Sequence, residues 1–207
     1  MTKAERKTTR RQEYAQATQL AIVDAARSLF AQRGYFATKV EDIAVAARVA
    51  PATVYAVAGG KQGLLHTLME TWTTDPIVAS TLQRISTMSD PVEVIRLTAT
   101  SAREMRERFA DVMRVMMTTA PHDRSVAEQL HVATTRYRKA LLPISRRLHV
   151  LGALLPGTTV EHAVDVLWFY FGYSSYFTLH DDNGWSYKKA EQWLADEACR
   201  ALLRANK

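Results

Sequence analysis

The chain has 207 residues, 47% of them hydrophobic and 23% charged, and a formal net charge of +6, a composition that excludes an intrinsically disordered protein. No run of about 18 apolar residues occurs, and the basic N-terminus lacks the apolar segment of a signal peptide, so we expect no membrane span and a cytoplasmic protein. The single cysteine, Cys199, excludes an intrachain disulfide and fits a reducing compartment.

Helical periodicity dominates the first third of the chain. Between Gln19 and Arg33 the apolar residues recur at the spacing of one helix face, and Gly34 follows as a C-terminal stop. The residues of that face are Ile22, Ala25, Ala26, Leu29 and Phe30. A first long helix ending near residue 33 is therefore predicted.

Two short helices should follow the first one. Thr38 is a candidate N-cap, and Glu41 stands three residues later, which makes a capping box for a helix over residues 39–47. Pro51 suits the first turn of another helix, over residues 51–57, because its missing N–H costs nothing there. Only about three residues separate the two helices, so the connection must be a tight turn.

Two glycines before Lys61 raise the possibility of a phosphate-binding loop. The motif G-x-x-x-x-G-K-[ST] would need a glycine where the chain has Tyr55 and a hydroxyl where it has Gln62. No strand precedes the loop either. We therefore interpret the glycines as a joint between the helix over residues 51–57 and a further helix over residues 61–72.

The rest of the chain is also expected to be helical. Residues 73–90 are polar and include Pro76, so we expect a bend or domain boundary there, and Asp90-Pro91 should open the next helix. Pro143 is expected to kink the helix that contains it. Helices are predicted over residues 91–108, 110–119, 124–151, 159–179 and 186–205. The fold class predicted from these patterns is all-α.

The pair of short helices matches a helix-turn-helix, whose second helix enters the DNA major groove. Thr53 on that second helix can bond a base edge or offer its methyl group to thymine. Residues 1–70 carry ten Lys/Arg and six Asp/Glu, so most of the positive charge lies in this part of the chain, as a polyanion partner would require. A small helical hairpin without DNA remains the alternative at this point.

These residues resemble the DNA-binding domain of TetR-family transcriptional regulators, whose pattern is roughly T-T-V-x-D-I-A-x-x-A-G-V-S-x-x-T-[LV]-Y-x-[HY]-F-x-[SN]-K-x-x-L. The chain matches it with Thr38-Lys39-Val40-Glu41-Asp42-Ile43-Ala44, Val49, Thr53-Val54-Tyr55, Lys61 and Leu64-Leu65. The resemblance implies an all-α protein with a basic arm over residues 1–17, a helix-turn-helix DNA-binding domain over residues 18–72 and an effector-binding and dimerisation domain over residues 73–207.

The resemblance also implies which residues contact DNA. Lys61 would begin the fourth helix and meet a phosphate with its ammonium group, and the hydroxyls of Tyr55 and Thr38 would bind phosphates as well. Such contacts fix the register of a protein on DNA but do not read its sequence. The expected DNA-binding residues are Thr38, Lys39, Val40, Ala50, Pro51, Ala52, Thr53, Tyr55 and Lys61.

The chain departs from the family pattern around the turn. Arg48 stands where the family has glycine, Ala50 replaces the usual serine N-cap, and Val57-Ala58 replaces an aromatic pair. Without the serine the third helix loses a cap worth about 1 kcal/mol. Because the recognition helix has so few polar groups, we expect contacts to thymine methyls and DNA shape to carry much of the specificity.

The N-terminal arm is strongly basic. Its cations could add phosphate or minor-groove contacts, and the alternative is a solubilising tail. The residues concerned are Lys3, Arg6, Lys7, Arg10 and Arg11.

The C-terminal half contains the methionines and aromatic residues of an adaptable apolar cavity. Ordinary core packing is the alternative for each of them, and together they favour an apolar or amphipathic effector. The expected ligand-binding residues are Met105, Phe109, Met113, Met116, Met117, Trp168 and Phe171.

The resemblance to TetR-family regulators implies a dimer formed by the last two helices. Residues 164–179 are apolar on nearly all sides, and the final helix adds Trp185, Trp193 and Leu194. A two-fold dimer would place two recognition helices about 34–36 Å apart on a pseudo-palindromic operator in double-stranded DNA.

Enzyme motifs are absent, and no cofactor or metal site is expected. The six histidines are scattered and form no H-E-x-x-H motif. The sequence therefore predicts a homodimeric DNA-binding regulator, a repressor released from its operator by a small effector. The alternative is a helical ligand-binding or interaction protein with a vestigial DNA-binding domain.

Overall fold

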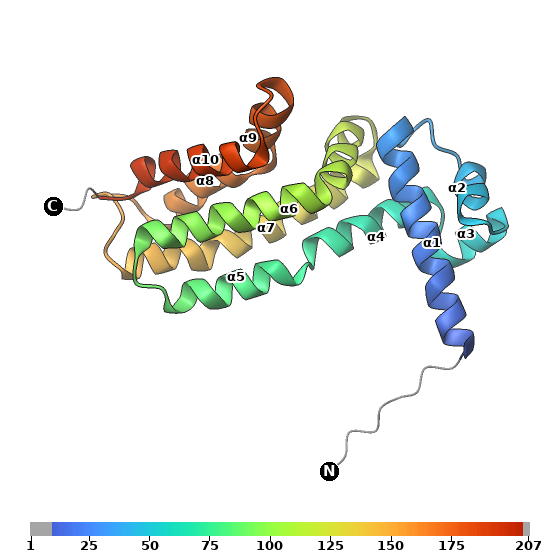
Figure 1. Cartoon of the computed structure of the whole chain (residues 1–207), viewed down its shortest axis with the longest axis horizontal. Helices are drawn as coiled ribbons and strands as arrows, with labels where there is room; N and C mark the ends of the chain where they lie inside the picture. The colour runs from blue at the N-terminus through green and yellow to red at the C-terminus, as the bar shows by residue number, and fades with distance from the viewer. Residues whose placement is uncertain (1–9, 205–207) are drawn as a thin grey trace, which may run out of the picture. The chain divides into compact units, whose positions relative to one another are not determined.

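A computed structural model describes residues 10–204 of the chain, and this part consists of helices joined by turns and loops (Figure 1). A 3₁₀ turn lies at Ala120–His122 and a π-helical turn at Thr178–Asp182. Within residues 10–204 the only β-type pairing is an isolated bridge between Leu154 and Leu203, so the all-α fold is confirmed. The α-helices are α1 (Arg10–Arg33), α2 (Val40–Ala47), α3 (Pro51–Ala58), α4 (Lys61–Thr73), α5 (Pro76–Thr87), α6 (Pro91–Thr119), α7 (Arg124–Val150), α8 (Val160–Phe171), α9 (Tyr173–Phe177) and α10 (Tyr187–Leu202).

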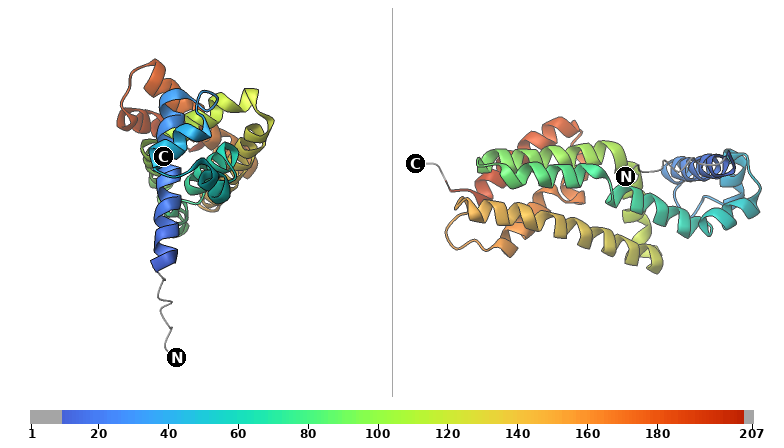
Figure 2. Two further views of the ribbon diagram at one scale, coloured as in Figure 1. Left: turned by 90° about the vertical axis from the view of Figure 1, so that its right-hand side faces the viewer. Right: turned by 90° about the horizontal axis from the view of Figure 1, so that it is seen from below.

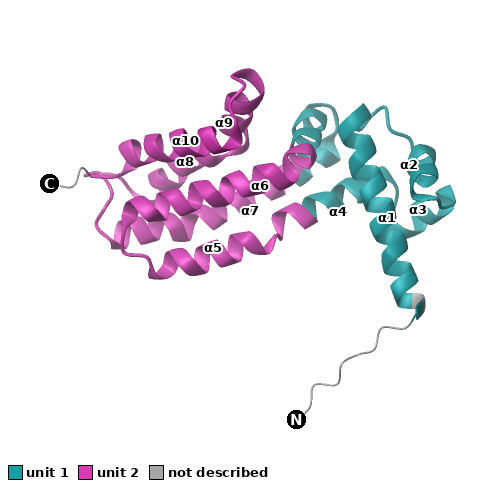
Figure 3. Cartoon of the chain, viewed as in Figure 1, with its two compact units in different colours: residues 1–70, 114–129 teal, residues 71–113, 130–207 magenta. Residues whose placement is uncertain are grey.

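The chain divides into two compact units (Figure 3). Unit 1 combines the chain up to residue 70 with residues 114–129, and unit 2 contains residues 71–113 together with the chain from residue 130 onward. The helices α4, α6 and α7 each contribute residues to both units. Among residues 10–204, none of the helices has the length and apolar composition needed to cross a bilayer.

Unit 1 is built around α1, against which α2 and α3 pack (Figure 2). Its core is formed by apolar side chains that are almost fully buried, namely Ile22, Ala26, Phe30, Ile43, Ala44, Val54, Leu64, Leu65 and Met69. The helix α1 begins nine residues before the periodic segment that predicted it. That first stretch is rich in Gln, Glu and Ala and has no Gly or Pro, so helix propensity extends α1 beyond its packed face.

Unit 2 is a bundle in which α5, α6, α7, α8 and α10 surround one apolar core. A segment expected to be a bend contains α5 instead. Its signal was present in the sequence, because Asp75 accepts a hydrogen bond from Ile77 N and Pro76 occupies the first helical turn. The break expected near residue 109 is also wrong, since α6 runs without interruption from residue 91 to residue 119.

The helix expected over residues 159–179 ends at Phe171. Gly172 adopts an extended conformation with φ −67° and ψ 179°, and its N–H still bonds to the Trp168 carbonyl oxygen at 2.8 Å. A Cβ atom at Gly172 would lie only 2.4 Å from that oxygen, so the break depends on glycine. After the break, α9 turns Tyr173, Tyr176 and Phe177 into the core.

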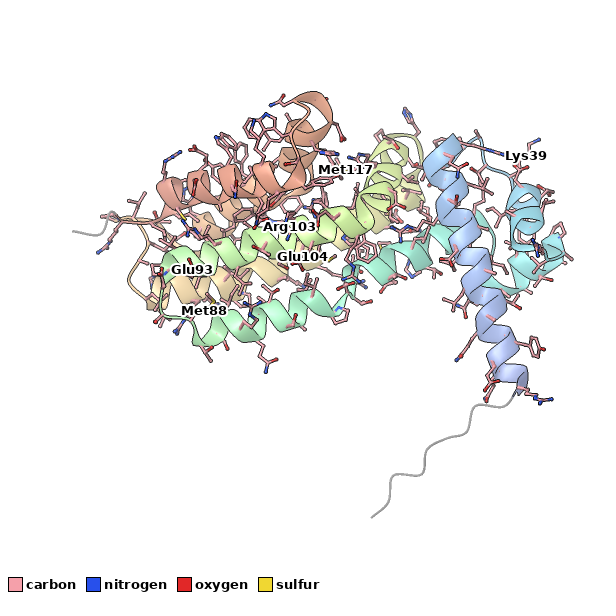
Figure 4. All side chains as sticks on the ribbon, viewed as in Figure 1. Lys39, Met88, Glu93, Arg103, Glu104 and Met117 are labelled. Atoms are coloured by element: carbon pink, nitrogen blue, oxygen red, sulfur yellow. The ribbon has the colours of Figure 1, made fainter. Side chains whose placement is uncertain are left out.

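A group of hydrogen bonds to one buried carboxylate links α6 to α10 in unit 2. Glu191 is buried and accepts hydrogen bonds from Thr100, Arg103 and Lys188. Burial alone would raise the pKa of Glu191, but these hydrogen bonds outweigh it and hold the pKa below its usual value. Arg103, which Figure 4 labels midway along α6, is thus fully engaged, since it also pairs with Glu107.

Candidate DNA-binding surface and ligand cavity

The α2–α3 pair of unit 1 has the geometry of a helix-turn-helix. Arg48 adopts the left-handed conformation, with φ 58° and ψ 43°, at the position where glycine would be unstrained. The turn is closed by backbone hydrogen bonds from Arg48 N to Val45 O and from Val49 N to Ala44 O. The turn therefore forms despite the arginine.

The outward face of α3 carries no charged side chain, and apart from Tyr55 its exposed side chains are small and apolar. Val54 is fully buried and anchors the helix, whereas Tyr55 is 56% exposed. The N-cap residue Ala50 has extended backbone angles and supplies no side-chain hydrogen bond, as the sequence indicated. The predicted recognition residues on this exposed face are Ala50, Pro51, Ala52 and Tyr55, and Thr53 is half-buried beside them.

The joint between α3 and α4 is tight. Gly59 and Gly60 both have positive φ angles, and Gly59 N bonds to Tyr55 O at 2.8 Å. The ring of Tyr55 covers Gly60 so closely that a Cβ atom there would lie 3.0 Å from Tyr55 Cε1. Gly63 approaches the end of α3 even more closely, because its Cβ would lie 1.6 Å from the Ala58 carbonyl oxygen.

Lys61 is turned into unit 1 by this joint, and the expectation that its ammonium group meets a DNA phosphate needs correction. Its Nζ donates to the carbonyl oxygens of Tyr35 at 2.7 Å and Thr38 at 2.8 Å, and lies 4.5 Å from the centre of the Tyr35 ring. Burial lowers the pKa of Lys61, and the negative charge of Asp123 opposes that shift. Two of its three N–H donors thus bind the protein itself.

Thr38 and Val40 also differ from the expectation. Thr38 is fully buried, and its hydroxyl donates to the Gly34 carbonyl oxygen at 2.8 Å, so it cannot offer that hydroxyl to a phosphate. Val40 is 7% exposed and belongs to the core. Both residues fix the connection between α1 and α2 instead.

The start of α2 lies one residue later than expected. Lys39 is its N-cap, and Lys39 N donates to Asp42 Oδ2 at 3.1 Å, so Asp42 rather than Glu41 completes the cap. The side chain of Lys39 is exposed at this end of the helix (Figure 4). Arg48, in the turn that precedes the uncharged α3, is exposed as well.

Part of the basic arm falls outside the described residues. Arg10 is exposed and begins α1, and Arg11 follows it in the helix. Lys3, Arg6 and Lys7 lie outside residues 10–204, so the arm's contact with DNA stays a prediction.

Unit 2 contains an apolar cavity of about 90 Å³. Its wall is made by side chains of α4, α5, α6, α7 and α9, and no Asp or Glu belongs to it. The lining residues are Trp72, Thr73, Val78, Thr81, Leu82, Thr98, Ser101, Ala102, Met105, Arg106, Ala133, Arg136, Tyr137, Ala140, Leu141, Ile144 and Tyr173.

Of the residues expected to bind a ligand, Met105 alone lines this cavity. Met116 and Met117 lie about three turns farther along α6, in the part that belongs to unit 1, and Figure 4 shows Met117 well beyond Arg103 on that helix. The other four, Phe109, Met113, Trp168 and Phe171, are partly or fully buried in unit 2 but do not belong to the cavity wall. Ordinary core packing, the alternative named for each residue, accounts for Phe109, Met113 and Phe171, which are at most 5% exposed.

The sequence reasoning missed the polar part of the wall, where Arg106 meets three tyrosines. Arg106 is 1% exposed, and its Nη2 donates to the Phe171 carbonyl oxygen at 2.9 Å. Tyr137 donates to the same oxygen at 2.7 Å. The sequence does indicate that Arg106 is buried, because it lies on the core face of α6, where buried residues recur every three or four positions. The other residues of that face are Ala99, Ala102, Phe109 and Met113.

Comparison with known proteins agrees with this geometry. Residues 22–68 match the family model for bacterial regulatory proteins of the tetR family. No curated protein matches the chain. Within residues 10–204, no group of three or more His, Cys, Asp or Glu side chains is placed to hold a metal ion.

Solved structures of the same fold cover nearly the whole chain. NalD, the secondary repressor of the MexAB-OprM multidrug efflux pump in Pseudomonas aeruginosa, aligns with a TM-score of 0.76 and 22% identity over 94% of this chain and 100% of its own. The complex of SmeT with triclosan gives 0.72 and 20% over 92% and 93%. The fatty acid degradation regulator FadR from Bacillus halodurans gives 0.71 and 16% over 88% and 94%. Residues 22–68 therefore form a DNA-binding domain of the TetR family of bacterial transcriptional regulators, and the chain as a whole shares the fold of these solved structures.

Proposed function

We propose that the protein is a repressor that leaves its operator when a small apolar or amphipathic effector occupies the cavity of unit 2. The observation that carries this proposal is the presence of an intact helix-turn-helix and a lined cavity in one chain. Three helices, α4, α6 and α7, continue from one unit into the other, which offers a route for a change at the cavity to reach α2 and α3.

The proposed DNA surface is the exposed face of α3 with the cations beside it. Ala50, Pro51 and Ala52 present apolar surface suited to thymine methyl groups, and the half-buried Thr53 would bond a base edge through its hydroxyl. Tyr55 is exposed and can donate to a phosphate. Lys39 and the backbone N–H groups at the start of α2 supply a second phosphate site. In this proposal Lys61 acts indirectly, by holding the α1–α2 connection in place.

The effector part of the proposal is supported by relatives of the same fold. SmeT forms a complex with triclosan, and NalD and SmeT are repressors of multidrug efflux pumps. Another neighbour, FadR from Bacillus halodurans, is a fatty acid degradation regulator. We infer that this chain also responds to a compound with a substantial apolar body, since the cavity wall is mostly aliphatic and aromatic.

A homodimer is the proposed assembly. Phe169 on α8 is 71% exposed and Trp193 on α10 is 42% exposed, an unusual exposure for large apolar side chains on two helices that pack together. A second copy of the chain would cover them. Sedimentation of the wild type and of Phe169→Glu should give a dimer and a monomer respectively, and a wild-type monomer at micromolar concentration would contradict the proposal.

Selection of bound duplexes from a random-sequence pool, at about 0.15 M salt to weaken nonspecific binding, tests the DNA-binding function. We expect one inverted repeat to be recovered. Thr53→Ala should relax the preference at one base pair, whereas Lys39→Ala should weaken binding to all sequences and reduce the salt dependence. Recovery of no motif by the folded protein would favour the alternative of a ligand-binding protein with a vestigial DNA-binding domain.

A further inference from the structure

The side chain of Arg106 is the largest one that is fully buried in the described part of the chain. A guanidinium group cannot lose its proton in a protein, so this position carries a permanent positive charge inside unit 2. Burying a charge is costly unless an opposite charge or several hydrogen bonds compensate it. The groups that contact Arg106 therefore indicate its role.

Compensation of this charge is incomplete. No carboxylate among residues 10–204 forms an ion pair with Arg106, and Glu191, the buried acid of unit 2, is already engaged by Arg103 and Lys188. The Phe171 carbonyl oxygen, at the negative end of α8, accepts from Nη2. Arg106 Nε is buried and has no hydrogen-bond partner.

Aromatic rings supply the remaining stabilisation. The Cζ atom of Arg106 lies 5.7, 5.3 and 5.5 Å from the ring centres of Tyr137, Tyr173 and Tyr176. Each such contact is weaker than the ion pair that a carboxylate would supply at a desolvated site. The rings of Tyr137 and Tyr173 also fix the orientation of the guanidinium group, because they pack on each other and on tryptophan rings.

Tyr173 adds a hydroxyl to the same place. Its Oη is buried without a hydrogen bond of normal geometry, although the nearby Thr134 hydroxyl lowers its pKa. Burial has the larger effect and raises the pKa of Tyr173, so the hydroxyl keeps its proton and remains a donor. Arg106 and Tyr173 both line the cavity, and each has a buried N–H or O–H group without a hydrogen-bond partner.

The charges of the cavity wall all have one sign. Arg106 and Arg136 belong to it, the second bonded through Nη1 to Thr73 Oγ1, and no acidic residue does. The other lining residues are mainly aliphatic or aromatic. An occupant that complements this wall has an apolar body and a single anionic oxygen group.

We propose that the effector is an amphipathic carboxylate, whose head group binds Arg106 and Tyr173 while its apolar body fills the rest of the cavity. The inference rests on the proposed function, since it names the chemistry of the molecule that would release the protein from DNA. A guanidinium N–H and a phenol O–H are suitable donors for the two oxygens of a carboxylate. Because Nε and Oη are both buried, binding requires the side chains of the wall to shift and expose them to the head group.

Pairs of ligands that differ only in charge provide the test. Binding of octanoate, decanoate and 2-naphthoate to the full-length wild-type protein would be measured by calorimetry, beside their primary amides. We expect each acid to bind about tenfold or more tightly than its amide, as a charge-assisted hydrogen bond at a desolvated site predicts. Equal affinities for acid and amide would overturn the carboxylate proposal without any variant being needed.

Variants then assign the preference to Arg106. In Arg106→Met the acid should lose its advantage while the amide still binds, and Arg106→Lys should keep part of it. Tyr173→Phe serves as a second, gentler variant and should reduce the preference for the acid about threefold, since it removes one hydrogen bond. Arg146→Met, a change at an exposed arginine on α7, is the matched control and should leave both affinities unchanged. An acid preference that survives in both Arg106→Met and Tyr173→Phe would place the anion elsewhere and contradict the proposal.

Measurements of DNA release distinguish the carboxylate inference from the effector-released repressor on which it rests. With the selected operator, the acids should release the wild-type protein and fail to release Arg106→Met. If neutral amides release DNA as well as the acids do, the effector-released repressor stands and the carboxylate inference fails. If acids bind and none releases DNA, the carboxylate site stands and the effector-released repressor is contradicted.

Discussion

Lys61 in unit 1 and Arg106 in unit 2 are cations withdrawn from solvent, and the protein binds them in different ways. Lys61 in unit 1 donates to two backbone carbonyl oxygens at 2.7 and 2.8 Å and remains partly exposed. Arg106 in unit 2 is 1% exposed, donates to one carbonyl oxygen at 2.9 Å and leaves Nε unpaired. Lys61 thus uses two of its three N–H donors on its own chain, whereas Arg106 has a buried N–H without a partner.

This difference indicates different roles. The carbonyl groups that bind Lys61 belong to the connection between α1 and α2, more than 20 residues earlier in the chain, so its charge stabilises the fold of the helix-turn-helix. Arg106 lies in the wall of a cavity without acidic residues, where the same physics leaves its charge available to a ligand. A glycine shapes each environment: Gly63 lets α4 approach the end of α3, and Gly172 ends α8 and frees the Phe171 carbonyl oxygen.

The largest expected effects come from those two glycines. Gly63→Ala would place a Cβ 1.6 Å from the Ala58 carbonyl oxygen, and Gly172→Ala would place one 2.4 Å from that of Trp168. Because backbone atoms must move in both cases, we expect a loss of about 3–5 kcal/mol in the free energy of unfolding. Thermal and urea unfolding of the full-length protein would measure it.

Gly157→Ala is the matched control for both variants. Its φ angle is +81° and no atom lies within 4 Å of the position that a Cβ would take, so only the strain of the left-handed backbone applies. That strain costs about 1 kcal/mol. If all three variants lost the same stability, close approach would not be the reason for Gly63 and Gly172.

The comparison of the two cations predicts effects of unequal size for the same change. Lys61→Met removes two charge-assisted hydrogen bonds from partly buried carbonyl groups, and we expect it to destabilise unit 1 by about 2–3 kcal/mol. Arg106→Met removes an incompletely compensated charge, so the free energy of unfolding should change by less than about 1 kcal/mol or rise. Hydrogen exchange would report the two units separately.

An exposed lysine provides the control here. Lys39→Met, at the N-cap of α2, should change the protection of the α2 and α3 amides little, whereas Lys61→Met should lower it strongly. Arg106→Met destabilising unit 2 as much as Lys61→Met destabilises unit 1 would show that both cations are structural, and the contrast between them would be lost.

Local signals in the sequence were sufficient for the helix-turn-helix. Proline at the first turn of α3, glycines after it and the spacing of apolar residues predicted α2 and α3 to within one residue at each end. The helix α5 was missed because its Ser- and Thr-rich composition is typical of a linker, although Asp75-Pro76 is the same start signal as the Asp90-Pro91 that correctly predicted the start of α6.

The partners of Lys61 and Arg106 could not be predicted in the same way. Lys61 stands where a phosphate contact is expected, but its partners are backbone oxygens 23 and 26 residues away, which no local pattern reveals. Methionines indicated an apolar cavity, yet helical spacing does not say which face of a long helix such as α6 lines a cavity and which fills a core. Arg106 stands within a charged stretch that is typical of a solvated surface, and only the 3–4 spacing of its neighbours places it inside.

The smallest expected effect concerns the start of α3, the part of unit 1 whose local signals are weakest. Ala50 has the extended backbone of an N-cap but no side-chain oxygen to accept a hydrogen bond from the first turn. Ala50→Ser should therefore stabilise the protein by about 1 kcal/mol in urea unfolding. Ala56→Ser, also exposed on α3 but away from its start, is the control and should be neutral or slightly destabilising, because serine is a poorer helix former than alanine.

Equal effects of the two changes would mean that the N–H groups at the start of α3 are already satisfied. A gain confined to Ala50→Ser would show that α3 is held by Val54 and the turn without help from a cap, as the buried position of Val54 indicates.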